Sequence, residues 1–427
     1  MDGRPTAPRR VPAGRAAPRP TVETVLITAV VVLCSLSVVM VYSASSVYAQ
    51  KAFGNTWAIL ARHGVYVAIG AALAVTAARL PLRVWRDRLA GLLLTVSFVA
   101  LAVIQIPGMP LAPEVNGASR WIRLGPLGFQ PSDLAKLALV LWLARLLALH
   151  QSEIGTTDLL KRALYVFVPM AALVMLGNDL GTTVLLGVIF MSMWFLAGAP
   201  LGQVGTLGAA MLGGALLATT LLEGFRVSRV MAFLHPSAHT SGTGYQTLQS
   251  QIGFATGGFW GAGPGASRAK WGFLPEAHTD FILAVIGEEL GVVGTVAVIA
   301  SLCAVVASGI VIGIRSKDPF GRFVAFGIST WLAVQALINV MVSVGAMPTK
   351  GIPLPFVSYG GTAMILALLA VGVLLSVSRA STPVTVAARS SRPRPPARSG
   401  PARSARPPAE PARRTSRPAG RPKRARR

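Results

Sequence analysis

Seven ionisable residues interrupt or border the long apolar runs of this chain, and their side chains are the first candidates for chemistry. They are Asp133, Lys136, Arg145, Asp179, Asp280, Glu288 and Glu289. A charge inside an apolar run is costly to bury, so such residues usually serve a function or a specific pairing. The isolated carboxylates lie toward the ends of the apolar runs rather than in the middle of them.

Asp280 follows Thr279 at the start of an apolar run that begins near Phe281. The dipole of a helix favours an ionised carboxylate in its first turn, so Asp280 is a candidate general base. Thr279 and Asp280 are also residue types that cap helices, and the local pattern alone favours capping. On a helix that includes Asp280, Glu288 would lie about 80° around the axis from it and Glu289 about opposite.

Asp133 and Lys136 are three positions apart, so on a helix they share one face and can form an ion pair. Ser132 just before them is suited to cap that helix. A buried ion pair of this kind either pins two helices together or serves a substrate. The pattern does not separate these two roles.

A glycine-rich segment, residues 253–265, holds six glycines and precedes Arg268, Lys270 and Trp271. Glycines allow a backbone to approach a ligand closely and to bind an anion, but they serve a tight turn equally well. Trp121, which lies between two arginines, suits either an interfacial anchor or a platform for a sugar ring.

The sequence contains no Walker motif, no His-Glu-x-x-His, no Gly-x-Ser-x-Gly and no His cluster with metal spacing. We therefore expect no nucleotide, no resident cofactor and no protein-held metal site. The sequence leaves open whether a divalent cation bridges a substrate pyrophosphate. The energy for any transfer reaction must come with the substrate.

The elements that position these residues follow from composition: 53% of the residues are hydrophobic, 13% are charged, and the mean hydropathy is +0.60. A soluble domain of 427 residues could not bury this apolar excess. Ten apolar runs approach the ~20 residues that cross a bilayer. They begin near Val22, Trp57, Leu89, Leu134, Ala163, Leu180, Gln203, Phe281, Phe323 and Thr362. The prediction is an all-α polytopic membrane protein with about ten transmembrane helices.

The net charge of +25 lies mostly in two tails, with +4 up to Pro20 and +14 from Arg379 onward. We expect disordered basic tails at residues 1–21 and 381–427, a membrane domain at 22–380 and a large outer loop at 223–278. Arginines and lysines of the short loops all fall on one side, which places that side and both termini in the cytoplasm. The tails suit anionic lipid or an acidic cytosolic partner rather than nucleic acid.

Three stretches closely resemble the SEDS family of shape, elongation, division and sporulation proteins, and together they span nearly the whole membrane body. They are residues 116–136 (NGASRWIRLGPLGFQPSDLAK), 245–291 (YQTLQSQIGFATGGFWGAGPGASRAKWGFLPEAHTDFILAVIGEELG) and 348–362 (PTKGIPLPFVSYGGT). Ordered strings of this length rarely match by chance. The segment from Gly263 to Trp271 is more similar to the division branch of the family than to the elongation branch.

The resemblance implies a SEDS-type fold and a glycosyltransferase that polymerises lipid II, whose undecaprenyl pyrophosphate already activates the sugar. Asp280 matches the family's essential outer-loop aspartate, the proposed base for the GlcNAc 4-hydroxyl as it attacks MurNAc C1 with inversion. The implied partner is a class B penicillin-binding protein, which would supply cross-linking. The basic tails would meet other division proteins at the septum of a bacterial plasma membrane.

A departing pyrophosphate needs cations opposite its developing charge. The outer or near-outer candidates are Arg120, Arg123, Lys136, Arg226, Arg229, Arg268, Lys270 and Lys350. Trp121, Asp133 and Glu288 complete the set of candidate substrate-binding residues.

The sequence departs from the family at two positions: Asp133 replaces the usual Glu, and Asn178 replaces the usual Pro, which puts the bend there in doubt.

Two other classes of function stay open. A transporter that flips lipid II would place its carboxylates at mid-bilayer. A non-catalytic scaffold that recruits a transpeptidase would not need Asp280, and an elongation role is the alternative within the family.

Overall fold

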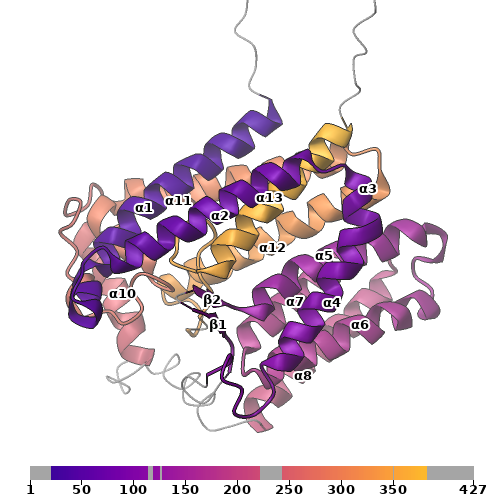
Figure 1. Ribbon diagram of the computed structural model, residues 1–427, viewed down its shortest axis with the longest axis horizontal. Helices are drawn as coiled ribbons and strands as arrows, with labels where there is room; N and C mark the ends of the chain where they lie inside the picture. Colours follow the sequence, from indigo (N-terminus) through magenta and orange to yellow (C-terminus); the bar gives the residue numbers. More distant parts are fainter. Residues whose placement is uncertain (1–20, 114–118, 126, 222–242, 350, 382–427) are drawn as a thin grey trace, which may run out of the picture. The chain divides into compact units, whose positions relative to one another are not determined.

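In the computed structural model, the structure describes residues 21–113, 119–125, 127–221, 243–349 and 351–381, and most of them form helices (Figure 1). Each of the ten predicted apolar runs contains a helix. These are α1 (Val22–Phe53), α2 (Ala58–Arg79), α4 (Ala90–Val103), α5 (Pro131–Leu149), α6 (Thr157–Leu176), α7 (Leu180–Leu196), α8 (Leu201–Leu221), α11 (Ile282–Arg315), α12 (Pro319–Ser343) and α13 (Thr362–Ser381). All the described residues lie in one unit, Met1–Thr382.

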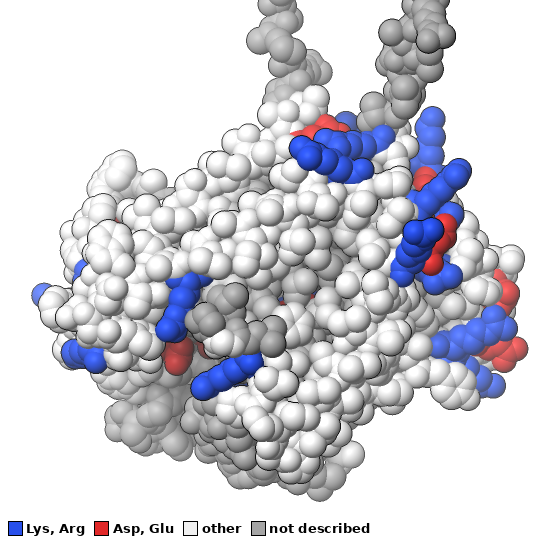
Figure 2. Space-filling model, in the orientation of Figure 1, with Lys and Arg blue, Asp and Glu red and all other residues white. Residues whose placement is uncertain are grey.

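Six helices among the described residues, α1, α2, α6, α11, α12 and α13, are long and apolar enough to cross a bilayer by length and composition. In the space-filling view, charged side chains gather toward the two ends of the face, and the surface between them is almost uncharged (Figure 2). Such a band suits the hydrocarbon core of a bilayer. The predicted all-α polytopic membrane protein is confirmed.

The remaining elements are short. α3 (Leu82–Val84) and the π-helical turn η1 (Trp85–Leu89) lead into α4, and the 3₁₀ turn η2 (Gln151–Glu153) follows α5. The strands β1 (Ile122–Leu124) and β2 (Leu127–Phe129) form an antiparallel pair before α5. α10 (Thr243–Gly257) and the 3₁₀ turn η4 (Ala269–Trp271) precede α11.

The outer segments contain structure that the sequence pattern did not predict. We expected residues 223–278 to be a loop, but α10 occupies 243–257. The apolar run that begins near Ala163 forms part of α6, which begins earlier, at Thr157, and has 20 residues. The predicted tails, apart from 21 and 381, and part of the outer loop, 222–242, lie outside the described residues.

Local signals explain where helices begin. Asp318 caps α12, because its carboxylate accepts a hydrogen bond from the Phe320 N–H at 2.9 Å, and Pro319 occupies the first turn, where a missing N–H costs nothing. Asp179 caps α7 in the same way through the Thr182 N–H at 3.0 Å. Asp179 is thus explained by helix capping.

Small residues allow α2 and α13 to pack at very close range. A Cβ added to Gly372 of α13 would lie 2.3 Å from the carbonyl oxygen of Ala74, and one added to Gly70 of α2 would lie 2.7 Å from Leu368. In a membrane, where lipid tails are as apolar as leucine, such close packing is a main source of helix association.

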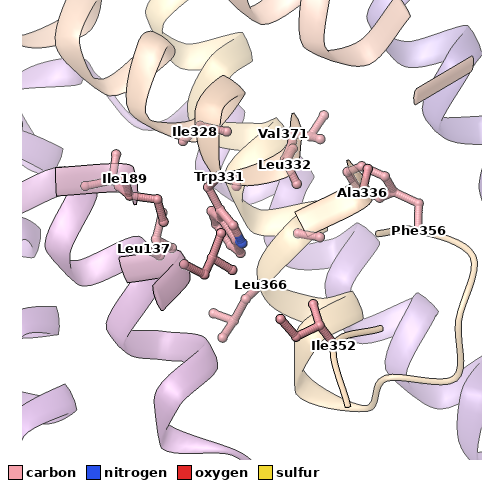
Figure 3. Packing of buried hydrophobic residues seen from close by; sticks show 14 of the residues in the cluster. Leu137, Ile189, Ile328, Trp331, Leu332, Ala336, Ile352, Phe356, Leu366 and Val371 are labelled. Carbon is pink, nitrogen blue, oxygen red and sulfur yellow. The ribbon is translucent and has the colours of Figure 1, made fainter. Parts of the chain in front are cut away.

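The core beside the outer segments is built around Trp331 of α12, whose side chain is 1% exposed. Figure 3 shows the indole beside Leu137 of α5 and Leu366 of α13. Ile352 and Phe356, in the segment between α12 and α13, are also buried, at 6% and 1% exposure. The segment between α12 and α13 therefore packs into the helix bundle instead of lying on its surface.

The long helix α11 bends at Gly291, where φ is +67° and ψ is −162°. A helix of 34 residues is longer than the ~20 residues that cross a bilayer, so it must tilt, bend or protrude. The bend also leaves backbone N–H and C=O groups of α11 available to the glycine-rich segment. The N–H groups of Ala262 and Gly263 donate to the carbonyls of Glu288 and Glu289. The N–H of Val292 donates to the carbonyl of Gly258. The segment thereby docks onto α11.

We expect Gly291→Ala to lower the free energy of unfolding by about 1–3 kcal/mol, because its φ is unfavourable for alanine and its Cβ would lie 2.4 Å from the Gly261 nitrogen. Thermal unfolding in detergent measures this. Gly205→Ala on α8 is the control, since its Cβ would meet nothing within 4 Å, and it should leave stability unchanged or raise it by up to about 1 kcal/mol. Equal unfolding temperatures for the two variants would contradict this role of the bend.

Candidate active site

Asp280 lies in a turn just before α11, and it is half-buried. The turn is closed by the carbonyl of Glu276, which accepts the N–H groups of Thr279 at 3.1 Å and Asp280 at 3.2 Å. The Thr279 hydroxyl also donates to Glu276. Phe281 is the N-cap of α11 and makes no side-chain capping bond, so the expectation that Thr279 and Asp280 cap this helix is wrong.

The segment between α12 and α13 faces the Asp280 carboxylate. A Cβ added to Gly351 would lie 3.7 Å from Oδ2 of Asp280, so this backbone passes directly beside the acid. Nδ2 of Asn339 donates to the Asp280 carbonyl at 2.9 Å. The candidate base is therefore held between its own turn, α12 and residues 351–353.

An aromatic cluster that sequence reasoning missed lies next to this turn. The His278 ring stacks on Tyr48 of α1 with 5.6 Å between centroids and contacts Tyr359 at 5.7 Å. The Tyr359 N–H donates to the His278 carbonyl at 3.0 Å. Burial lowers the pKa of His278, which favours the neutral imidazole at pH 7, and burial raises the pKa of the Tyr359 hydroxyl.

Arg62 of α2 is a second residue that the sequence did not single out. Its guanidinium lies 4.8 Å from the centre of the Phe53 ring, and its positive charge partly opposes the rise in the pKa of Tyr359. Arg62 forms no ion pair with any described residue. Its position as a lone arginine within an apolar run was the available signal.

The predicted pairing of Asp133 with Lys136 is confirmed. Nζ of Lys136 lies 2.8 Å from Oδ1 of Asp133, and both side chains are nearly inaccessible, at 3% and 5% exposure. The Thr362 hydroxyl of α13 donates to Asp133 at 3.0 Å, and Lys136 donates to Gln335 of α12 at 3.2 Å. The shorter carboxylate of Asp133 therefore still pairs, and the pair joins α5 to α12 and α13.

Glu288 and Glu289 both receive hydrogen bonds from the segment that follows the glycine-rich loop. Glu288 accepts from the Ser267 hydroxyl and from the backbone of Arg268 at 2.8 Å and Ala269 at 3.4 Å. Glu289 accepts from the Ser43 hydroxyl and from the Ser267 N–H at 3.3 Å. The two carboxylates therefore fasten this segment to α11. The helical-wheel expectation placed Glu289 opposite Asp280, but α11 begins at Ile282, so Asp280 is not part of that helix.

Glu288→Gln should destabilise this segment more than Glu289→Gln, by about 1–3 kcal/mol. Both oxygens of Glu288 accept hydrogen bonds, so in Glu288→Gln the amide NH₂ must face a donor. In contrast, Oε2 of Glu289 has no hydrogen-bond partner among the described residues. Limited proteolysis within residues 258–273 measures the difference. Equal protection of the two variants would contradict the assignment.

The outer cations differ in how they are used. Arg120 donates to the carbonyls of Gly177 at 3.1 Å and Asn178 at 2.6 Å, which stabilises the bend between α6 and α7. Asn178 adopts φ +61°, a conformation that proline cannot reach, so the bend exists with a different backbone from the one a proline would give. Arg123 is exposed.

The other predicted site residues are less closely placed. The Trp121 ring lies against Gly128, and a Cβ there would be 3.2 Å from it. The Arg268 side chain is exposed, and Lys270 donates to the carbonyl of Gly265. Arg226, Arg229 and Lys350 lie outside the described residues. Over the described ranges no three His, Cys, Asp or Glu side chains gather as a metal site.

The family model of the cell cycle proteins FtsW, RodA and SpoVE matches residues 24–383. The chain belongs to this family. The predicted resemblance to the SEDS proteins is thereby confirmed.

Family relatives match over most of their own length. A protein of Idiomarina loihiensis named "Probable peptidoglycan glycosyltransferase FtsW" is 38% identical over 84% of this chain and 88% of its own. One of the same name from Geobacter metallireducens is 40% identical over 83% and 93%. Curated relatives are thus named for the division branch.

Solved structures show the same fold. A structure of a peptidoglycan synthase complex that coordinates polymerization and crosslinking matches with a TM-score of 0.69 at 27% identity, over 84% of this chain and 98% of that one. The rod shape determining protein RodA of Thermus thermophilus matches with a TM-score of 0.60 at 27% identity, over 83% and 95%. The SEDS-type fold predicted from the motifs is confirmed.

Proposed function

We propose that this family member is a peptidoglycan glycosyltransferase that polymerises lipid II into glycan strands during cell division, with Asp280 as the general base. The half-buried carboxylate of Asp280, held in a turn between α12 and residues 351–353, is the observation that carries the proposal. The names of the relatives support the activity and the division role.

In this mechanism Asp280 takes the proton from the GlcNAc 4-hydroxyl of one substrate while that oxygen attacks MurNAc C1 of the other. The bond from C1 to the pyrophosphate oxygen breaks on the opposite face, so the anomeric centre inverts. Undecaprenyl pyrophosphate leaves with the electron pair. A positioned base of this kind typically contributes about 10²–10⁴-fold to the rate.

The leaving pyrophosphate requires cations that are not already neutralised. Arg268 and Lys270 are free of ion pairs with described residues, and Arg62 joins them as a half-buried cation beside the Tyr359 hydroxyl. Lys136 is already paired with Asp133, so its contribution is to organise the helices around the site. A divalent cation, if one is used, would be held mainly by the pyrophosphate itself.

Membrane orientation and partners belong to the same proposal. The basic short loops place both termini in the cytoplasm of a bacterium, and the Asp280 turn outside, where lipid II headgroups are used. The solved synthase complex supports a class B penicillin-binding protein as the partner. We expect a member of the division branch to act at the septum, where the basic tails would contact anionic lipid and other division proteins.

The test is reconstitution of the purified protein with its penicillin-binding partner in liposomes that contain lipid II. We expect glycan strands longer than the disaccharide, and no transfer of fluorescent lipid II between leaflets above that of empty liposomes. Translocation without strands would overturn the proposal in favour of a flippase. If strands are absent while the partner's cross-linking still depends on this protein, a scaffold role replaces it.

A further inference from the structure

Asn339 of α12 occupies a position that the proposed reaction does not explain by itself. Its side chain is 1% exposed, and its Nδ2 group donates two hydrogen bonds, to the carbonyls of Asp280 and Ile352, each at 2.9 Å. The two amide protons therefore bond to two chain segments that lie far apart in sequence. One of these segments carries the candidate base.

The orientation of this amide is fixed by chemistry. Two carbonyl oxygens face it, so the NH₂ group must point toward them, because a flipped amide would place its own oxygen against two acceptors. Oδ1 of Asn339 is buried and has no hydrogen-bond partner among the described residues. The side chain thus leaves its oxygen without a hydrogen bond, while both of its N–H groups donate to the carbonyls of Asp280 and Ile352.

A second amide extends the arrangement by one helical turn. Gln335 lies four residues before Asn339, so the two side chains share one face of α12. Nε2 of Gln335 donates to the Pro353 carbonyl at 2.9 Å, and its Oε1 accepts from Lys136 at 3.2 Å. Consecutive carbonyls of residues 352 and 353 are therefore held by consecutive turns of one helix.

We propose that Asn339 is a positioning residue that sets the place of Asp280 relative to residues 351–353. Because Gly351 passes beside Oδ2 of Asp280, any loosening of this segment or of the Asp280 turn changes the site around the carboxylate. Asn339 acts only through the backbone and touches no reacting atom. The inference rests on the proposed function of Asp280.

The test compares Asn339→Leu, which has similar size and no donors, with Asn339→Asp, which keeps the shape but offers oxygens to both carbonyls. We expect kcat for lipid II polymerisation to fall by about 10- to 100-fold in both, since a shift of about 1 Å can cost 10²-fold. KM should change less than threefold, because no substrate contact is removed. Asn339→Gln, which keeps the donor group, should recover part of kcat.

The control is Ser329→Ala, a buried position on the same helix whose hydroxyl bonds only within α12. This variant should match the wild type in kcat. Hydrogen exchange supplies a second measurement that needs no activity. The backbone amides of residues 276–282 and 351–354 should exchange faster in Asn339→Leu than in the wild type. In Ser329→Ala their exchange rates should equal those of the wild type. If Asn339→Leu does not fold, the exchange comparison is made with Asn339→Asp.

The inference is overturned if the Asn339 variants keep wild-type kcat and exchange, or if KM rises while kcat stays constant. Such results leave the proposed function intact, because the wild type would still make glycan strands. Absence of strands from the wild type overturns the proposed function instead. In that case faster exchange of both segments still supports the positioning contact.

Discussion

Asp280→Asn is expected to lower the rate of glycan polymerisation by about 10²–10⁴-fold, the usual contribution of a general base. The amide keeps the size of the carboxylate and leaves the backbone bond from Asn339 in place, so the turn should stay intact. The change removes the negative charge of the side chain and with it the capacity to accept a proton. The effect should appear in kcat, with little change in KM for lipid II, because the lost interaction exists in the transition state.

Steady-state polymerisation of purified lipid II, with the penicillin-binding partner present, measures this effect. Asp158→Asn is a matched control, because it makes the same chemical change on an exposed side chain near the start of α6. This control should retain wild-type kcat. An Asp280→Asn enzyme with the same unfolding temperature as the wild type and kcat within tenfold of it would remove Asp280 from the role of base.

The helical architecture was predictable because the bilayer dictates it. A run of about 20 apolar residues in lipid must satisfy its backbone internally, so a helix follows from composition alone. The pairing of Asp133 with Lys136 was predictable for a similar reason, since a spacing of three residues on one helix brings side chains together whatever the rest of the fold does. Both predictions depend only on local sequence.

Contacts between distant segments could not be predicted in this way. Asn339 and Asp280 are 59 positions apart, and nothing in either local pattern indicates their hydrogen bond. The expected faces of Glu288 and Glu289 assumed a helix that already included Asp280, but α11 begins two residues later, at Ile282. Their contacts are set by Ser267 and by α1, which approach the helix from elsewhere in the chain.

The site residues also differ in how visible they were. Asp280 was conspicuous because a carboxylate beside an apolar run is rare, and the family resemblance gave it a role. Arg62 was overlooked because it belongs to no recognisable motif, and only the fold brings it near Tyr359. The sequence thus indicates which residues are unusual, whereas the tertiary contacts determine which of them act together.

Lys136→Met is expected to lower the free energy of unfolding by about 3–5 kcal/mol, the cost of leaving a buried charge without its partner. Asp133 would keep only the Thr362 hydroxyl, which cannot neutralise a carboxylate that is 5% exposed. The double variant Asp133→Asn with Lys136→Met removes both charges, so its cost should be smaller, near the ~1 kcal/mol of each lost hydrogen bond. Thermal and denaturant unfolding in detergent measure all three proteins.

The exposed pair Asp158 and Lys161 supplies the matched control for this cycle. Its atoms are 3.9 Å apart and its side chains are 78% and 66% exposed, so water screens the interaction. Lys161→Met should therefore cost less than about 1 kcal/mol. A double variant as unstable as Lys136→Met alone would contradict charge compensation as the main role of the pair. The recovery of stability in the double variant would show that Lys136 acts chiefly to neutralise Asp133 and so to hold α5 against α12 and α13 beneath the Asp280 turn.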